Sequence, residues 1–179
     1  TYINGFFDRH TITYGESAYG YPQDGQTIVN LPDAQTIILK IDGNPVDLNY
    51  AKLLDLKRSY DLENGFTTRS ALYETMDGIQ LWIHSKRLAH LTFNPLFMID
   101  YTIESVNYRG LIHIESTLNG DIENLITAND MRAGSQLSKR IHALEIHTHD
   151  DEAEMVIETL ATHFKCTIGM THSTSFQYT

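Results

Sequence analysis

The sequence lacks the features that would place the protein in a membrane, in an oxidising compartment or on a polyanion. It contains one cysteine, Cys166, which excludes an internal disulfide. It has no apolar run long enough to cross a bilayer. Only 13 Lys and Arg residues stand against 23 Asp and Glu, and the formal net charge of -10 repels phosphate backbones and anionic lipid. We expect a soluble, cytoplasmic protein that binds neither nucleic acid nor membranes.

Signals of a leader and of several domains are also missing. The chain does not open with a charged segment followed by an apolar segment and then small residues, so no signal peptide is expected. No repeat and no Gly- or Ser-rich linker divides the 179 residues, and 41% hydrophobic residues suffice for one full core. We expect a single domain over residues 1–179. The start at Thr1, within an apolar aromatic segment, indicates that this domain is part of a longer protein.

Helical patterns are scarce, and alternating apolar residues predominate. Ile79, Leu81 and Ile83 alternate with Gln80, Trp82 and His84, which would face the other way. Alternation of this kind predicts strands with one buried face. Similar patterns, some less regular, occur over residues 97–104, 111–116, 142–148 and 154–170.

Tight-turn signals separate these predicted strands. Asp-Gly or Asn-Gly pairs supply the positive backbone dihedrals that hairpins require, and they occur at residues 42–43, 64–65 and 77–78. Short strands joined by such turns are typical of an antiparallel sandwich. The predicted fold class is therefore all-β.

Three segments are harder to interpret. Residues 26–48 predict a loop, then a strand, then a hairpin turn. Residues 47–62 fit a helical turn and an irregular strand equally well, because their apolar residues match neither period fully. Residues 129–144 form the most polar segment and predict a long loop.

A histidine and acidic cluster raises the question of a metal site. His147 and His149 would share one face of a strand, and Asp150, Asp151 and Glu152 follow directly. Two imidazoles and a carboxylate can hold zinc, but such sites need further ligands from a distant segment, and the sequence shows none. The simpler interpretation is a solvated strand end that leads into an acidic turn, and we assign no metal ligand.

No catalytic residue can be assigned. The segment Gly15–Ser17 lacks the second glycine of a nucleophile elbow. Cys166 lies within an apolar strand pattern, where a thiol is usually inert packing. Carboxylates are too numerous for a pair to be selected for glycoside chemistry.

One loop is a candidate ligand contact. Residues 14–24 combine Tyr14, Tyr19 and Tyr21 with glycines, Pro22 and Asp24. Flat phenol rings beside hydrogen-bonding groups can stack on a sugar ring and orient it. The simpler interpretation is a surface loop whose tyrosines fold back on the sheet, because aromatic side chains also cover cores.

Several segments in order resemble one known family. They read "TYINGFFD", "IVNLPDAQTIILKIDGNPVDL", "RSYDLENGFTTRSALYE" and "KRLAHLTFNPLFMIDYTIESVNYRGLIHIESTLNGDIEN". Their order and spacing resemble the N-terminal domain of glycoside hydrolase family 65, which holds maltose, trehalose and kojibiose phosphorylases and some trehalose-cleaving hydrolases. The resemblance covers most of residues 1–124.

The resemblance implies a large two-sheet antiparallel β-sandwich, the supersandwich of galactose mutarotase-like domains, ahead of an (α/α)6 catalytic barrel. The barrel supplies the family's general acid and phosphate-binding loop, so no catalytic residue is transferred to this chain. The implied substrates are α-linked glucose disaccharides, with inorganic phosphate as co-substrate in a phosphorylase and no other cofactor.

The family's domain normally begins with further strands that this chain lacks. A sandwich without them would leave backbone edges and apolar surface uncovered, which favours pairing with another copy. The expected partners are therefore the enzyme's own C-terminal barrel, a disaccharide and a second copy of the chain. The alternative function is a stand-alone carbohydrate-binding or assembly module that uses Tyr14, Tyr19, Tyr21 and Asp24.

Overall fold

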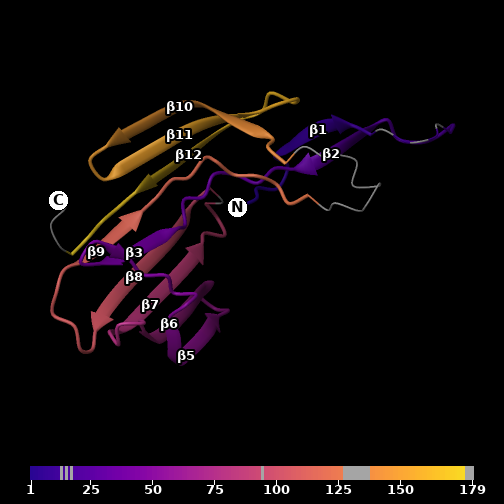
Figure 1. Ribbon diagram of the computed structural model, residues 1–179. Helices are drawn as coiled ribbons and strands as arrows, with labels where there is room; N and C mark the ends of the chain where they lie inside the picture. Colours follow the sequence, from indigo (N-terminus) through magenta and orange to yellow (C-terminus); the bar gives the residue numbers. More distant parts are fainter. Residues whose placement is uncertain (13, 15, 17, 94, 127–137, 176–179) are drawn as a thin grey trace. The chain divides into compact units, whose positions relative to one another are not determined.

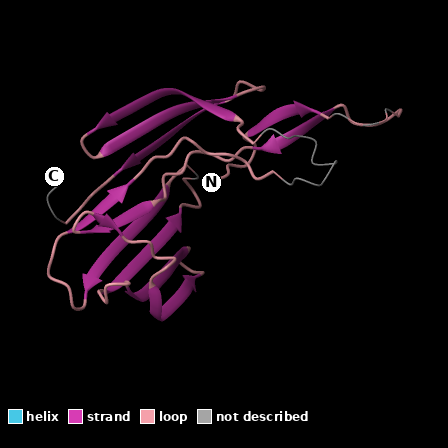
Figure 2. Cartoon of the chain, viewed as in Figure 1, coloured by secondary structure: helices cyan, strands magenta, loops and turns pink. Residues whose placement is uncertain are grey.

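The computed structural model describes residues 1–12, 14, 16, 18–93, 95–126 and 138–175. These residues form twelve strands and no helix (Figure 1, Figure 2). The strands are β1 (Phe7–Thr11), β2 (Asp24–Ile28), β3 (Ile37–Ile41), β4 (Asn44–Pro45), β5 (Lys52–Asp61), β6 (Phe66–Glu74), β7 (Gln80–Ala89), β8 (Phe97–Ser105), β9 (Ile112–Ser116), β10 (Ile141–His149), β11 (Glu152–Thr159) and β12 (Lys165–Thr171). The described part of the chain accordingly contains no helix that could span a bilayer.

The chain divides into two compact units. The terminal unit consists of Thr1–Thr36 and Ser116–Thr179, and the central unit of Ile37–Glu115. The terminal unit contains the β1–β2 hairpin and the sheet β10-β11-β12, while the central unit contains the sheets β4-β3-β9 and β5-β6-β7-β8. One domain over residues 1–179 stays a prediction.

The core of the terminal unit lies on one face of β11. Met155 and Ile157 alternate with exposed or half-buried residues on this strand, and both are buried. They pack with Ile141 at the start of β10 and with Val29 and Leu31, which follow β2 in the chain. An extended apolar segment therefore covers the inner face of the three-stranded sheet.

The core of the central unit lies between its two sheets. Six buried side chains form it: Leu39 and Ile41 of β3, Ala71 and Tyr73 of β6, and Leu81 and Ile83 of β7. The register places Ala71 opposite Ile83 and Tyr73 opposite Leu81, so the apolar positions of β6 and β7 coincide on one face. This coincidence allows β3 to bury them together.

The opposite face of the four-stranded sheet is polar and aromatic. Trp82 stacks on His84, with parallel rings whose centroids are 5.6 Å apart. His84 Nδ1 lies 2.9 Å from the Ser70 hydroxyl, and Lys86 Nζ lies 3.7 Å from the centroid of the Phe66 ring. The two faces of one sheet thus differ sharply in chemistry.

The predicted all-β, antiparallel class is confirmed. Leu81 and Ile83 are each 1% exposed, as their alternation predicts. The predicted turn at Asp42-Gly43 joins β3 to β4, and both residues have positive φ, 48° and 83°. Residues 47–62, where two interpretations stood open, contain an irregular strand, since the β5–β6 register shifts between Leu53 and Asp55.

Two predicted loops are partly wrong. Gln26 does not begin a loop, because it lies within β2 and pairs with Arg9 of β1. The connection from β1 to β2 is longer than a tight turn. The predicted loop at residues 129–144 ends too late, because Ile141 already pairs with Thr159 in β10–β11. Residues 129–137 of that prediction lie outside the described residues. The first error concerns β2, which is defined by its pairing with β1. The second concerns only the start of β10, whose alternation over residues 142–148 predicts a strand.

Candidate functional site

The predicted tyrosine loop connects β1 to β2. The rings of Tyr14 and Tyr21 lie 4.9 Å apart at 49°, so the structure brings these two together. Tyr19 makes no ring contact with any described residue, and Asp24 lies at the start of β2, opposite Thr11. Only two of the four predicted ligand-contacting residues therefore form a direct pair.

The exposure of the tyrosines does not fit a loop folded back on a core. Tyr14, Tyr19 and Tyr21 are 36%, 108% and 52% exposed. A phenol ring as open as that of Tyr19 offers both faces to a flat ligand. Ligand binding by this loop stays a prediction.

A steric fit next to this loop holds β1 and β2 in register. Gly25 lies opposite His10, and a Cβ at position 25 would lie 2.5 Å from His10 Nε2. Burial and the nearby Arg140 guanidinium lower the pKa of His10, against the opposing effect of Asp8 and Asp24. A neutral, packed imidazole thus fills the space that glycine leaves.

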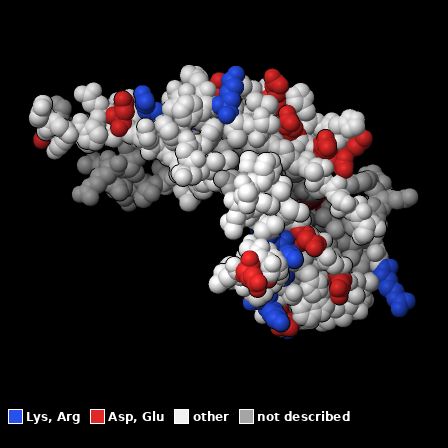
Figure 3. Space-filling model, turned by 180° about the vertical axis from the view of Figure 1, so that it is seen from behind, with Lys and Arg blue, Asp and Glu red and all other residues white. Residues whose placement is uncertain are grey.

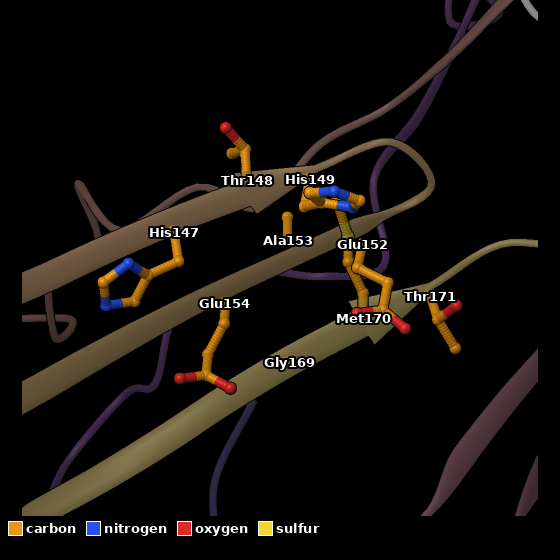
Figure 4. Close-up of a pocket in the computed structure, with 9 residues that line it drawn as sticks. All are labelled: His147, Thr148, His149, Glu152, Ala153, Glu154, Gly169, Met170 and Thr171. Carbon is orange, nitrogen blue, oxygen red and sulfur yellow. The ribbon is translucent and has the colours of Figure 1, made fainter.

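A shallow hollow of about 380 Å³ on β10, β11 and β12 is lined by three residues of the histidine and acidic cluster, His147, His149 and Glu152 (Figure 4). The register places His147 opposite Glu154 and His149 opposite Glu152, which confirms that the two histidines share a face. Gly169 on β12 lies opposite Glu154 in the register, and a Cβ at position 169 would meet only the backbone oxygen of Ala153, at 3.9 Å.

Each of the two imidazoles in this hollow already lies close to a carboxylate that is near it in the sequence. His147 Nε2 lies 3.3 Å from Glu145 and His149 Nδ1 lies 3.2 Å from Asp150, and all four side chains are well exposed. Within the described ranges, no group of three or more His, Cys, Asp or Glu side chains is placed to hold a metal ion. The geometry matches a solvated strand end that leads into an acidic turn, in which Asp150 has a φ of 46°.

A buried ion pair, which the sequence did not reveal, ties the terminal unit together. Asp8 and Arg140 are 1% and 2% exposed, with 3.6 Å between Oδ2 and Nη1. Asp8 Oδ1 also accepts hydrogen bonds from the backbone N–H groups of Ala161 and Thr162, at 2.9 and 3.0 Å. The partners lie far apart in the chain, and no local motif marks them.

Cys166 is a free thiol on β12. Burial raises its pKa, because the thiolate would lose hydration. A thiol with a raised pKa is a poor nucleophile near neutral pH. The expectation of inert packing at this position fits its environment.

A family profile matches the chain over its whole length. The profile described as glycosyl hydrolase family 65, N-terminal domain, covers residues 1–179. The chain belongs to this family. The resemblance predicted from residues 1–124 is therefore confirmed, and it extends to the last residue.

Relatives of this family 65 domain are longer proteins. Over 141 residues it is 36% identical to the alpha,alpha-trehalose phosphorylase of Thermoanaerobacter brockii, which covers 79% of this chain and 18% of the relative. It is 28% identical to the kojibiose phosphorylase of Halothermothrix orenii, over 69% of this chain and 14% of the relative. The chain thus spans about a fifth or less of the length of these curated relatives.

A solved structure shares the fold. A protein from the human microbiome, provisionally named a kojibiose phosphorylase, matches 95% of this chain and 21% of its own, with a TM-score of 0.76 and 20% identity. The family 65 fold is thus supported independently of close sequence identity.

Proposed function

We propose that the chain is the non-catalytic N-terminal domain of a longer family 65 enzyme that acts on α-linked glucose disaccharides. The observation that supports the proposal is the 36% identity to an alpha,alpha-trehalose phosphorylase over 79% of the chain. The domain would pack on its own C-terminal catalytic barrel in a cytoplasmic enzyme.

The proposed reaction is inverting cleavage of the glycosidic bond. In phosphorolysis, inorganic phosphate attacks the anomeric carbon while a barrel glutamate protonates the departing oxygen, and no further cofactor takes part. In hydrolysis, a second carboxylate would activate water. The described residues of this chain act only as scaffold in either reaction.

The test compares the full-length enzyme with this chain on trehalose, kojibiose and maltose, with and without phosphate. We expect phosphate-dependent release of glucose 1-phosphate by the full-length enzyme and no turnover by the chain alone. Phosphate-independent glucose release would identify a hydrolase. Turnover by the isolated chain, or no cleavage of any of these sugars by the full-length enzyme, would contradict the proposal.

A second candidate function is sugar binding by the isolated chain, and the full exposure of Tyr19 favours it. In that case titration calorimetry with the same disaccharides would detect binding that Tyr19→Ala removes. Tyr50→Ala provides the control, since Tyr50 is also strongly exposed but lies outside the loop, in the central unit.

A further inference from the structure

One face of the four-stranded sheet changes from apolar to basic along its strands. Residues two apart on a strand share a face. Arg69 on β6 therefore lies on the face of buried Ala71, and Arg87 on β7 lies on the face of buried Ile83. Arg58 on β5 pairs directly with Arg69. We call Arg58, Arg69 and Arg87 the arginine face.

Tyrosines surround these arginines. Arg69 donates a hydrogen bond to the Tyr73 hydroxyl, and its guanidinium carbon lies 5.5 Å from the centroid of that ring. Tyr101 on β8 occupies the same face, and burial raises its pKa, while both Arg69 and Arg87 act to lower it. Both guanidinium groups therefore lie near the same phenol.

The arginine face has no anionic partner in the described part of the chain. No described carboxylate lies within 4.0 Å of a guanidinium nitrogen of Arg58, Arg69 or Arg87. This lack of neighbouring carboxylates is specific to the arginine face. The chain has 23 acidic residues, and acidic side chains are spread over the surface in Figure 3. Arg58 and Arg87 are exposed, and Arg69 is half-buried.

This arrangement is unfavourable for the chain by itself. Like charges directly opposite each other on neighbouring strands destabilise a sheet, and Arg58 and Arg69 occupy such a pair of positions. Guanidinium groups bind carboxylates through two parallel hydrogen bonds. An acidic surface placed against these strands would convert the repulsion into attraction.

We propose that Arg58, Arg69 and Arg87 form a docking surface for a carboxylate-rich surface of the catalytic part of the full-length enzyme. The inference rests on the proposed function, since it requires that catalytic part. The matched region makes up 18% of the trehalose phosphorylase relative, so most of such an enzyme lies outside this chain.

Two other occupants fit less well. A second copy related by a two-fold axis would bring the arginine face against itself, because such interfaces use the same patch on both subunits. A single small anion is too narrow to contact the whole arginine face, because β5 and β7 are two strand spacings apart, about 10 Å. Several carboxylates on one protein surface match this width.

The experiment measures one substitution in two contexts. Arg58→Thr removes the repulsion from Arg69, so in the isolated chain it should raise Tm by roughly 1–3 °C. In the full-length enzyme the same substitution should lower the Tm of this domain in calorimetry, because a docking contact is lost. Salt should reduce this loss, because charge pairs are screened.

Lys57→Thr is the matched control, since Lys57 is adjacent on β5, points to the opposite face and pairs with Ser70. It should shift Tm equally in the two contexts. A change of the same sign for Arg58→Thr in both contexts would overturn the docking surface, as would a control that also reverses sign. If the full-length enzyme is an active phosphorylase but the Tm change for Arg58→Thr has the same sign in both contexts, only this inference is contradicted. If the Tm change reverses sign but the enzyme releases no glucose 1-phosphate, only the proposed function is contradicted.

Discussion

At the scale of single residues, Asp8 holds a carboxylate where water has almost no access. Its Oδ1 accepts two backbone N–H groups, and the Arg140 guanidinium lies beside Oδ2. A buried charge of this kind contributes little net stability when it is paired, but its partner becomes costly when the pair is broken.

Asp8→Ala should therefore lower the free energy of unfolding by about 3–5 kcal/mol, because Arg140 keeps its charge in a buried site. Urea denaturation followed by circular dichroism measures the change. Asp121→Ala is the control, because Asp121 pairs with Lys139 in an exposed position, and its midpoint should hardly move. Equal shifts for the two variants would show that burial does not decide the cost.

At the scale of the element, the β1–β2 hairpin depends on the absence of a side chain. A methyl group at position 25 would overlap the His10 ring. Gly25→Ala should destabilise the chain by roughly 1–3 kcal/mol through overpacking. His10→Ala in the same chain should restore most of this loss, and a double-mutant cycle measures it. Additive effects would mean that the two positions do not meet.

The elements also show which strands a sequence reveals. β7 was predictable because Leu81 and Ile83 alternate with residues of the other face, and both are buried. β2 was not, because its five residues are exposed or half-buried, and pairing with β1 defines it. Local patterns report burial, whereas edge hairpins form through partners that the pattern does not contain.

At the scale of the whole molecule, family membership was predictable from ordered segments, but polar contacts between distant strands were not. The tyrosine loop could be named from its composition, yet only Tyr14 and Tyr21 meet. Asp8 and Arg140, and likewise Arg58 and Arg69, become neighbours only through folding. Long-range pairing is set by the sheet register, and single-residue types do not encode it.

Self-association of the isolated chain is expected at this scale. β5 is an edge strand of its sheet, and Leu53, Leu54 and Leu56 on it are 46%, 38% and 39% exposed. Such edges can pair with another copy. Sedimentation should show a mass that rises with concentration, and Leu54→Lys should reduce the rise. The mass of one copy at every concentration would contradict this expectation.

The residues that occur once in the chain are divided between the units. Trp82 is the single tryptophan and lies in the central unit, and Cys166 is the single cysteine and lies in the terminal unit. A dye attached to Cys166 at alkaline pH, where the thiolate forms, would accept energy from the indole. The efficiency of this energy transfer would therefore report the distance between the two units without any substitution in the natural sequence.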